Sequence, residues 1–236
     1  MLQKSIIYQK KKINLYIPKT VFQPTATTNF LLDETLKIIK KPIKILDLGC
    51  GCGIIGIIVG KRLNFKREIY ASDASINAVK IAKKNFKKAK IKNTVKHGNL
   101  FSPWKGEKFD LIINDVSGVS SLIAKKSEWF KNVPCNTGLD GSNLTMKIVN
   151  QTSKFLNKKG KIIFAIISLS NVKKIMNYSK KKFRKVTVLS KNEWFLPNDL
   201  MKEKELLFKM KKKKKIDYKI KFGKIVCYTL IVMAQN

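Results

Sequence analysis

The sequence has 236 residues, of which 44% are hydrophobic, and this composition excludes an intrinsically disordered chain. Lysine and arginine number 50 against 15 aspartate and glutamate, so the net charge of +35 favours polyanionic partners such as nucleic acid, ribosomal particles or anionic membrane surfaces. No signal segment opens the chain and no apolar run approaches the roughly 18 residues of a membrane span, so we expect a cytoplasmic protein without membrane contact.

The first 40 residues predict a small segment ahead of the main domain. Two β-leaning runs at residues 5–8 and 13–17 predict a hairpin. In the next stretch, V-F-Q-P-T-A-T-T-N-F-L-L, Thr27 or Thr28 can cap a helix whose apolar residues recur at near-helical spacing. We expect residues 1–40 to cover the site and residues 41–236 to form one domain.

From residue 44 onward, short apolar runs alternate with amphipathic segments. We predict strands at residues 44–48, 68–71, 94–96, 109–113, 161–168, 185–189 and 224–233, and helices at residues 54–63, 74–88, 144–156 and 172–182. This alternation predicts an α/β fold with a mostly parallel sheet and helices on both faces. The lysine run at residues 211–215 is expected to be a solvated loop.

A glycine-rich turn follows the first of these strands, in I-L-D-L-G-C-G-C-G-I-I-G. Gly51, Gly53 and Gly56 match the dinucleotide-binding fingerprint, and Asp73 lies 20 positions after Gly53, where a carboxylate can accept hydrogen bonds from a ribose. Asp47 precedes the turn, and its charge would repel a pyrophosphate but not an amino group or a sulfonium. The turn therefore favours a cationic nucleoside ligand over a nicotinamide dinucleotide.

The four cysteines do not predict a disulfide or a metal site. Cys50 and Cys52 are separated by one glycine, which is too close for an ordinary disulfide or for the usual zinc spacing. We interpret them as small side chains in the glycine turn and expect no metal.

These residues resemble a known family. D-L-G-C-G-C-G, together with Asp73, is similar to motif I and the acidic motif II of class I S-adenosylmethionine-dependent methyltransferases, and the resemblance covers roughly residues 20–235. It implies a Rossmann-like, seven-stranded sheet whose last strand is antiparallel, with S-adenosylmethionine as the cofactor. The residues that it implies at the cofactor are Thr28, Asp47, Gly49, Cys50, Gly51, Gly53, Asp73, Ala74, Asn99, Leu100 and Asn114.

Within that set, the resemblance assigns separate parts of the cofactor. Asp47 and the glycines would cradle it, Asp73 would hold the ribose, and Asn99 with Leu100, in G-N-L, would lie at the adenine. Many relatives have aspartate at the position of Asn99, but an asparagine still offers an acceptor oxygen to the adenine amino group.

Three further stretches resemble the small-domain branch of that family, which includes the HemK-like protein-glutamine N5-methyltransferases and several guanine-N2 rRNA enzymes. They are V-F-Q-P-T-A-T-T-N-F-L-L, the turn G-L-D-G at residues 138–141, and I-I-N-D-V-S at residues 112–117. The last stands where those families carry N-P-P-[YF]. In that motif the asparagine and the next carbonyl hold the NH2 group to be methylated, while the aromatic ring packs on its plane.

Only the asparagine of that motif is present here, because Asp115 and Val116 replace the prolines and Ser117 replaces the aromatic residue. Three interpretations stay open. Asn114 holds an NH2 group with another packing partner; Asp115 binds or deprotonates a different nucleophile, such as an amine or hydroxyl; or Asn114 only caps the strand and the site is altered or inactive. Asn114 and Asp115 are therefore the candidate catalytic residues.

Other side chains are weaker candidates. Trp104, Trp129 and Trp194 could line a substrate mouth, and Trp129 with the adjacent Phe130 is the best aromatic candidate. His97, the only histidine, is expected to be structural.

The resemblance implies in-line methyl transfer to a protein side chain, with the glutamine amide as one candidate, and hence a protein substrate. The charge favours two alternatives, an rRNA N-methyltransferase acting on a ribosomal particle and a catalytically silent RNA- or ribosome-binding protein on the same fold. The abundance of lysine, isoleucine and asparagine is explained equally well by an AT-rich genome. The 40 residues before the domain leave no room for the helical substrate domain of HemK-like enzymes, so we expect recognition by the hairpin, the loops or a partner subunit.

Overall fold

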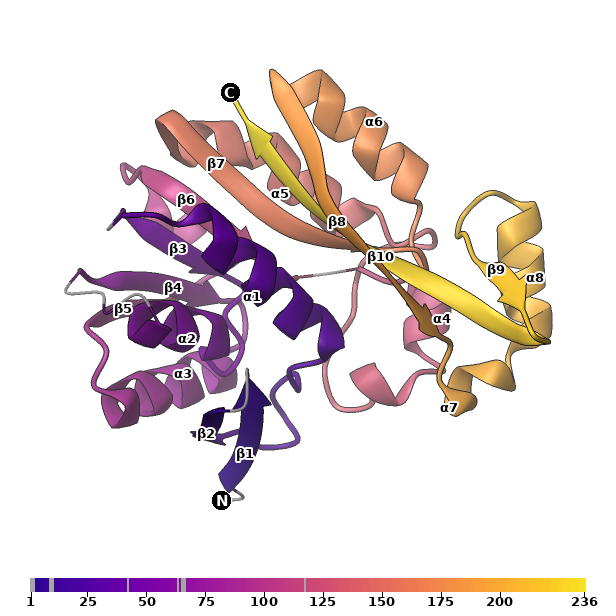
Figure 1. Ribbon diagram of the computed structural model, residues 1–236, viewed down its shortest axis with the longest axis horizontal. Helices are drawn as coiled ribbons and strands as arrows, with labels where there is room; N and C mark the ends of the chain where they lie inside the picture. The colour runs from indigo at the N-terminus through magenta and orange to yellow at the C-terminus, as the bar shows by residue number, and fades with distance from the viewer. Residues whose placement is uncertain (1–2, 9–10, 42, 63, 65–66, 117) are drawn as a thin grey trace. The chain divides into compact units, whose positions relative to one another are not determined.

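The computed structural model describes residues 1–236 except 1–2, 9–10, 42, 63, 65–66 and 117 (Figure 1). The contacts divide the chain into two units. Unit 1 comprises residues 1–115 and 154–163, and unit 2 comprises residues 116–153 and 164–236. No helix in the described part of the chain is long and apolar enough to cross a membrane.

In its described residues, unit 1 contains a hairpin, a set of parallel strands, three α-helices and one 3-10 turn. Its strands are β1 (Gln3–Tyr8), β2 (Lys11–Tyr16), β3 (Ile45–Leu48), β4 (Ile69–Asp73), β5 (Asn93–His97) and β6 (Phe109–Asn114). Its helices are α1 (Ala26–Ile38), α2 (Ile54–Arg62), α3 (Ile76–Ala89) and the 3-10 turn η1 (Ser102–Trp104). The predicted hairpin is confirmed, since β1 pairs antiparallel with β2.

The parallel strands of unit 1 place their carboxyl ends at one edge. Strand β3 pairs with β4 on one side and with β6 on the other, and β4 pairs with β5. In this register Asp47 lies opposite Ala71 and Ile113, while Leu48 lies opposite Asn114. Ligands of open α/β sheets bind at the carboxyl ends of the strands, so this register determines where a site can form.

Unit 2 contains the remaining helices and the antiparallel strands. Its elements are α4 (Ser121–Ala124), η2 (Glu128–Phe130), α5 (Asn143–Thr152), α6 (Val172–Lys182), β8 (Lys185–Phe195), α7 (Asn198–Met201), α8 (Lys204–Lys212), β9 (Lys219–Lys221) and β10 (Lys224–Gln235). The elements that begin in one unit and end in the other are η3 (Ser153–Phe155) and β7 (Leu156–Ile167).

The hydrogen-bonded strand order is β5-β4-β3-β6-β7-β10-β8, and the short β9 pairs with β10. The predicted α/β fold and its mostly parallel seven-strand plan are confirmed, and the last strand, β10, runs antiparallel to β8 as expected. Strand β9 was missed because it has only three residues, Lys219 to Lys221, all of them exposed. Helices α7 and α8 were also missed, and Leu200 and Leu207 anchor them in the core of unit 2.

Several boundary predictions were wrong: α5 ends at Thr152, β7 begins at Leu156 rather than at residue 161, and β8 continues to Phe195 rather than ending at residue 189. Helix α1 begins at Ala26 with Thr25 as its N-cap, whereas Thr28 lies in the first turn and accepts the Thr25 N–H at 3.1 Å. The lysine run is not a loop throughout, because α8 continues to Lys212. Lysines in the last turn of a helix interact favourably with its macrodipole, so they extend α8 rather than ending it.

Candidate functional site

The glycine turn between β3 and α2 leaves open space at one of its glycines. Gly51 and Gly53 have φ values of +53° and +81°, a region that side chains rarely adopt. A Cβ added to Gly53 would lie 2.9 Å from the ring of Phe86, so this glycine packs closely against α3. A Cβ added to Gly51 would meet no described atom within 4 Å, so the turn has room for a ligand at that position.

Asp47 is a fully buried carboxylate just before the turn. Its Oδ2 accepts the Gly56 N–H at 3.0 Å, whereas its Oδ1 has no hydrogen-bond partner among the described residues. Burial raises the pKa of Asp47 to about 7, the Gly56 N–H opposes this, and the carboxylates of Asp115 and Asp73 raise the pKa further. A buried oxygen without a partner is a position where a bound donor or cation is expected.

Asp73 ends β4 with its carboxylate oriented by two backbone groups. Its Oδ2 accepts the Gly51 N–H at 2.9 Å, and its Oδ1 accepts the Ser75 N–H at 2.8 Å. Each oxygen keeps a second lone pair. The carboxylate can therefore accept two neighbouring hydroxyl groups, as the ribose assignment requires.

The turn after β5 lies against the end of β4. The Gly98 N–H donates to the Asp73 carbonyl at 3.0 Å, which brings Asn99 beside this strand end. Asn99 is exposed, and Leu100 has a φ of +50°. A left-handed leucine is uncommon and marks a turn that the surrounding structure holds in place.

Asn114 is the buried residue at the end of β6, opposite Leu48 of β3. It is 1% exposed, and neither its Nδ2 nor its Oδ1 has a partner among the described residues. Each unpaired buried polar group costs about 1–3 kcal/mol. This cost disfavours the interpretation of Asn114 as a mere strand cap, because a cap would be hydrogen-bonded.

Asp115 is held by the helix that precedes the main sheet. The Thr28 hydroxyl donates to its Oδ2 at 2.6 Å, so α1 is joined to the end of β6. Burial raises the pKa of Asp115 to about 7, and the Thr28 hydrogen bond opposes the rise. Asp115 therefore changes its charge near neutral pH.

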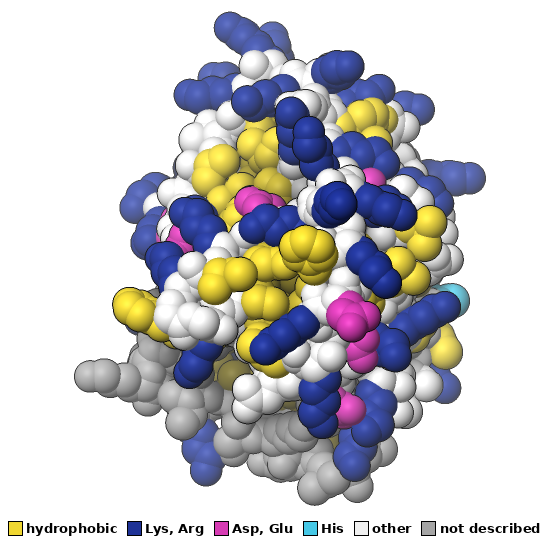
Figure 2. All heavy atoms as spheres, turned by 90° about the vertical axis from the view of Figure 1, so that its right-hand side faces the viewer, with side chains coloured by type: hydrophobic (Ala, Val, Ile, Leu, Met, Phe, Trp, Pro, Cys, Tyr) yellow, Lys and Arg dark blue, Asp and Glu magenta, His cyan; other side chains and the backbone are white. Residues whose placement is uncertain are grey.

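Carboxylates gather at this site although the chain is basic. Figure 2 shows lysine and arginine side chains across one face of the molecule, with few acidic side chains between them. Asp73 and Asp115 both raise the pKa of Asp47, so the three carboxylates are close enough to interact. Negative charge at this edge favours a ligand that carries positive charge.

Asn85 is a structural residue of the site that sequence reasoning missed. Its side chain is fully buried, its Oδ1 accepts the Tyr16 N–H at 2.8 Å, and its Nδ2 donates to the carbonyls of Tyr16 and Cys52, both at 2.9 Å. It thus connects β2 to the glycine turn. The available signal was one polar residue on the apolar face of α3, between Ala82 and Phe86.

The cysteines of the turn are inert. Cys50 and Cys52 are buried, and burial raises the pKa of Cys52 to about 12, so its thiol stays neutral. This agrees with their interpretation as small side chains. No cluster of three or more metal-ligating side chains occurs among the described residues.

The predicted aromatic and histidine residues divide between core and surface. Trp104 does not line a mouth, because it is fully buried and its Nε1 donates to the Ser72 hydroxyl at 2.9 Å. Trp129 and Trp194 contact each other in unit 2 at a centroid distance of 5.9 Å. The Nε2 of His97 lies 3.0 Å from the Ala74 carbonyl oxygen, a backbone contact that fits its expected structural role.

Of the predicted site residues, the structure places all eleven cofactor candidates and Asp115 in unit 1, on α1 or at the carboxyl ends of β3 to β6. The G-L-D-G turn lies in unit 2, where Asp140 accepts hydrogen bonds from the Ser142 N–H and hydroxyl. Ser117 lies outside the described residues.

Comparison with known proteins identifies relatives of the chain. A family model described as methyltransferase small domain matches residues 23–115. The release factor glutamine methyltransferase of Dictyoglomus turgidum is 30% identical over 203 residues, which span 78% of this chain and 69% of that protein. The protein of the same name from Borreliella burgdorferi is 34% identical over 168 residues, which span 66% of this chain and 58% of that protein.

Solved structures share the fold. A T. thermophilus 16S rRNA N2 G1207 methyltransferase, in complex with AdoMet and guanosine, has a TM-score of 0.65 at 12% identity and covers 100% of this chain and 50% of that one. A ribosomal protein L11 methylase from Lactobacillus delbrueckii has a TM-score of 0.60 at 18% identity, covering 95% and 86%. The chain spans 58%, 54% and 62% of the first three curated relatives that it matches.

Proposed function

Because this chain belongs to the release factor glutamine methyltransferases, a HemK-like branch of the class I S-adenosylmethionine-dependent methyltransferases, we propose that it methylates a protein side chain, with the glutamine amide as the favoured target. The observation that carries the proposal is the amide of Asn114, which is buried at the end of β6 with both polar atoms unpaired among the described residues. An amide is the side chain best matched to a second amide, since each offers one donor group and one acceptor.

The glycine turn and its carboxylates fit S-adenosylmethionine. When bound, this cofactor supplies an activated methyl group on a cationic sulfonium. Asp47 has a free buried oxygen for a cationic or N–H group, and Asp73 can accept two ribose hydroxyls. Gly51 leaves room beside the turn, and Asn99 with Leu100 would contact the adenine.

The residues after β6 suit an amide nitrogen as the acceptor of the methyl group. The Asn114 amide oxygen can accept one N–H of the target, which aims the nitrogen for in-line attack. The nitrogen would gain the methyl carbon as the carbon–sulfur bond of the bound cofactor breaks, and it would lose one proton. Asp115, with a pKa raised to about 7, is the neighbouring group able to take that proton.

The hydrogen bond from Thr28 compensates for the missing prolines. A proline restricts the backbone by fixing φ, and this restriction is absent at Asp115. The Thr28 hydroxyl holds the Asp115 carboxylate at 2.6 Å instead, from a helix in the same unit. Aspartate in place of the first proline therefore still has its position fixed, and it adds a titratable carboxylate beside Asn114.

Three finer points are part of this proposal. Residues 1–40 act as a cover for the site, the hairpin, the loops or a partner subunit recognises the substrate, and the protein works in the cytoplasm. The alternative that the charge of +35 favours is a substrate within rRNA or a ribosomal particle. A silent RNA-binding protein on this fold is the third candidate.

A labelling experiment separates these candidates. The full chain is incubated with S-adenosylmethionine carrying a radiolabelled methyl group and with cell extract treated with RNase or with protease. We expect label that survives RNase and is lost with protease, and mass spectrometry should find one added methyl group on a glutamine. Label that is lost with RNase would indicate rRNA as the substrate instead. If no label is transferred and calorimetry detects no cofactor binding at millimolar concentration, the catalytically silent RNA-binding protein would be the remaining candidate.

Two substitutions connect this activity to the site. Asn114→Ala should abolish labelling while calorimetry still detects the cofactor, because the residue orients the substrate. Asp73→Ala should weaken cofactor binding itself, at least tenfold, since two hydroxyl contacts are lost. Equal loss of cofactor binding in Asn114→Ala and Asp73→Ala would contradict the assignment of substrate orientation to Asn114 and of cofactor binding to Asp73.

A further inference from the structure

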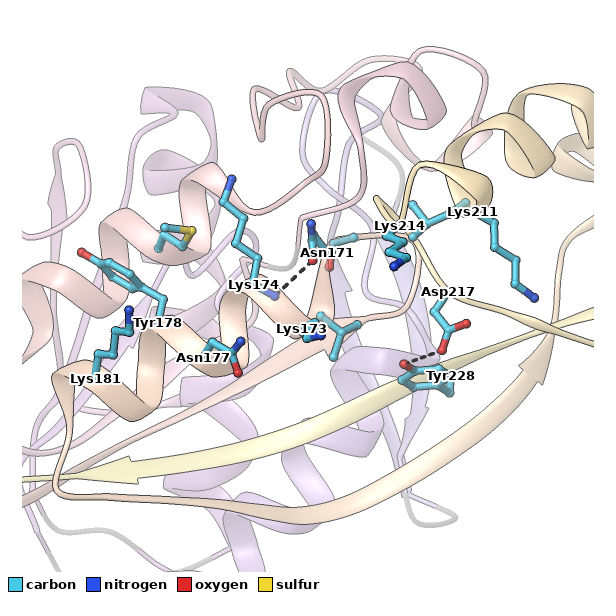
Figure 3. A pocket seen from close by; sticks show the side chains of 14 residues that line it. Asn171, Lys173, Lys174, Asn177, Tyr178, Lys181, Lys211, Lys214, Asp217 and Tyr228 are labelled. Atoms are coloured by element: carbon cyan, nitrogen blue, oxygen red, sulfur yellow. Dashed lines mark hydrogen bonds between the residues drawn. The ribbon is translucent and has the colours of Figure 1, made fainter.

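A groove in unit 2 has the chemistry of a polynucleotide site. Its volume is about 950 Å³, at the upper end of the range for ligand pockets. Every residue that lines it belongs to unit 2, so it shares no residue with the site described above. Figure 3 shows that helix α6 contributes Lys173, Lys174, Asn177, Tyr178 and Lys181.

Three lysines of the groove carry charge that the protein does not neutralise. Lys173, Lys181 and Lys214 are exposed and form no ion pair with any described residue. The other two lysines of the groove have partners, since Lys174 pairs with Asp140 at 3.1 Å and Lys211 donates to the Tyr218 carbonyl at 2.5 Å. Positive charge in a concave surface focuses the field on an anionic ligand more strongly than the same charge on a flat surface.

Other lysines of unit 2 are arranged differently. Lys191, Lys219 and Lys221 surround the carboxylate of Glu193 at 3.0, 3.8 and 2.8 Å. These ion pairs neutralise part of the charge of the three lysines. Exposed lysines without an ion pair to any described residue also occur elsewhere in unit 2, such as Lys202, Lys204 and Lys209, so the groove differs only in bringing three of them together on one concave surface.

The spacing on α6 suits an extended, charged chain. Lys173, Asn177 and Lys181 follow one another at four-residue intervals, so they lie along one face of the helix. A rise of 1.5 Å per residue separates the two lysines by about 12 Å along the axis. Ammonium groups at both ends, with an amide between them, form a linear row of donors.

Two tyrosines supply aromatic surface beside the lysines. Tyr178 donates its hydroxyl to the Asn150 side chain at 3.0 Å, and Tyr228 donates its own to Asp217 at 3.0 Å. These bonds fix the rings, which are half-buried. The same bond occupies Asp217, the one carboxylate that lines the groove among the described residues. Tyrosine rings beside lysines are the combination that stacks bases while binding phosphates.

We propose that this groove binds a short stretch of single-stranded RNA. Lys173, Lys181 and Lys214 contact phosphates, and Tyr178 and Tyr228 contact bases. The Asn177 amide offers a donor and an acceptor, which suits the 2′-hydroxyl that distinguishes RNA from DNA. The aromatic rings favour RNA over an acidic protein segment, because a carboxylate gains nothing from the face of an electron-rich ring. The proposal does not depend on methyl transfer.

Fluorescence anisotropy with a labelled uridine 12-mer tests it on the full chain without cofactor. The variant Lys173→Gln/Lys181→Gln/Lys214→Gln should bind at least tenfold more weakly. The slope of log affinity against log salt concentration should be smaller in magnitude by about 2 in this variant. Each phosphate contact on a single strand contributes roughly 0.7 to that slope, and three contacts are lost. Tyr178→Leu should weaken binding about tenfold, whereas Tyr178→Phe, which keeps the ring, should bind as the parent does.

The matched control is Lys202→Gln/Lys204→Gln/Lys209→Gln, which removes three exposed lysines of unit 2 that do not line the groove. This control should change the affinity less than threefold. Equal losses in the control and the groove variant would overturn the proposal in favour of diffuse surface charge. A 12-residue polyglutamate peptide that binds as tightly as the RNA would overturn it in favour of an acidic protein segment. A thymidine DNA 12-mer that binds equally well would contradict the choice of RNA.

Discussion

Asn114 and Asp115 are neighbours with opposite hydrogen-bonding states. The amide of Asn114 is unpaired among the described residues, whereas the carboxylate of Asp115 is fixed by Thr28. One group is therefore available to a substrate while the other is positioned by the protein. This division supports the two open interpretations in which Asn114 orients the target and Asp115 handles a proton.

The Thr28 hydroxyl should control the titration of Asp115. Its hydrogen bond stabilises the ionised carboxylate, so Thr28→Val should raise the pKa of Asp115 further above about 7. We therefore expect the pH profile of kcat for methyl transfer, measured between pH 6 and pH 9, to shift to higher pH in this variant. Thr27→Val, on the same helix, is the control and should leave the profile unchanged. An unshifted profile in Thr28→Val would exclude Asp115 as the group that accepts the proton.

Cofactor affinity should rise with pH. Asp47 and Asp115 both have a pKa raised to about 7, and a cationic ligand binds the ionised forms better. We expect the affinity for S-adenosylmethionine to increase several-fold from pH 6 to pH 8 and then to level off. Calorimetry in two buffers of different ionisation enthalpy should also detect proton release on binding. Asp115→Asn should reduce both effects, and equal affinity at pH 6 and pH 8 in the parent would contradict the cationic fit.

In the cofactor-free protein, Asp47 and Asp115 make the free energy of unfolding fall as pH rises, whereas they make cofactor affinity rise with pH. Their pKa in the folded protein is raised above the value of 3.8 for an ordinary aspartate, so the folded state holds more protons than the unfolded state between about pH 4 and pH 7. The stability they contribute is full below about pH 4 and is lost as pH rises through 7. Urea unfolding of Asp115→Asn should therefore depend less on pH in this range than unfolding of the parent.

At the scale of elements, the site is assembled by polar side chains that join separate segments. Thr28 joins α1 to the end of β6, and Asn85 joins β2 to the glycine turn. The apolar periodicity of α3 and α6 was enough to predict that they exist, because each buries one face, whereas α2 is buried on all sides from Ile54 to Gly60. It did not predict these connections, since a single polar residue does not change the period.

Asn85→Leu should loosen the glycine turn. The substitution removes three hydrogen bonds, two to partly buried backbone groups of Tyr16 and one to the buried carbonyl of Cys52. We expect a loss of about 3 kcal/mol in the free energy of unfolding by urea, together with weaker cofactor binding. Asn77→Leu, at an exposed position of the same helix, should change the free energy by less than about 0.5 kcal/mol. A similar loss in both variants would mean that Asn85 has no special role.

At the scale of the whole molecule, the net charge of +35 sets the electrostatics. Like charges repel one another in the compact state, and salt screens this repulsion, since the Debye length falls from about 30 Å at 0.01 M to about 10 Å at 0.1 M. The thermal midpoint should therefore rise by several degrees between these two sodium chloride concentrations. A midpoint that falls with salt would mean that attractive ion pairs outweigh the repulsion.

The sequence by itself determined the α/β class, the order of most elements, the glycine turn with Asp47 and Asp73, and the asparagine at the end of β6. Each of these depends on residues that are close together in the chain, where hydrophobic period, turn chemistry and charge can be read directly. Boundaries were less certain, as Thr25 and α8 illustrate, because several neighbouring residues can cap or extend a helix.

Only the tertiary structure decided which side chains meet. Thr28 and Asp115 are 87 positions apart, and Asn85 and Tyr16 are 69 positions apart, so no local pattern connects them. The groove lysines likewise come from α6, from the end of α8 and from the residues just after α8. Such contacts depend on how the strands pair and the helices cross, and one local sequence is compatible with many of these arrangements. The unpaired amide of Asn114 became apparent only when all its neighbours were in place.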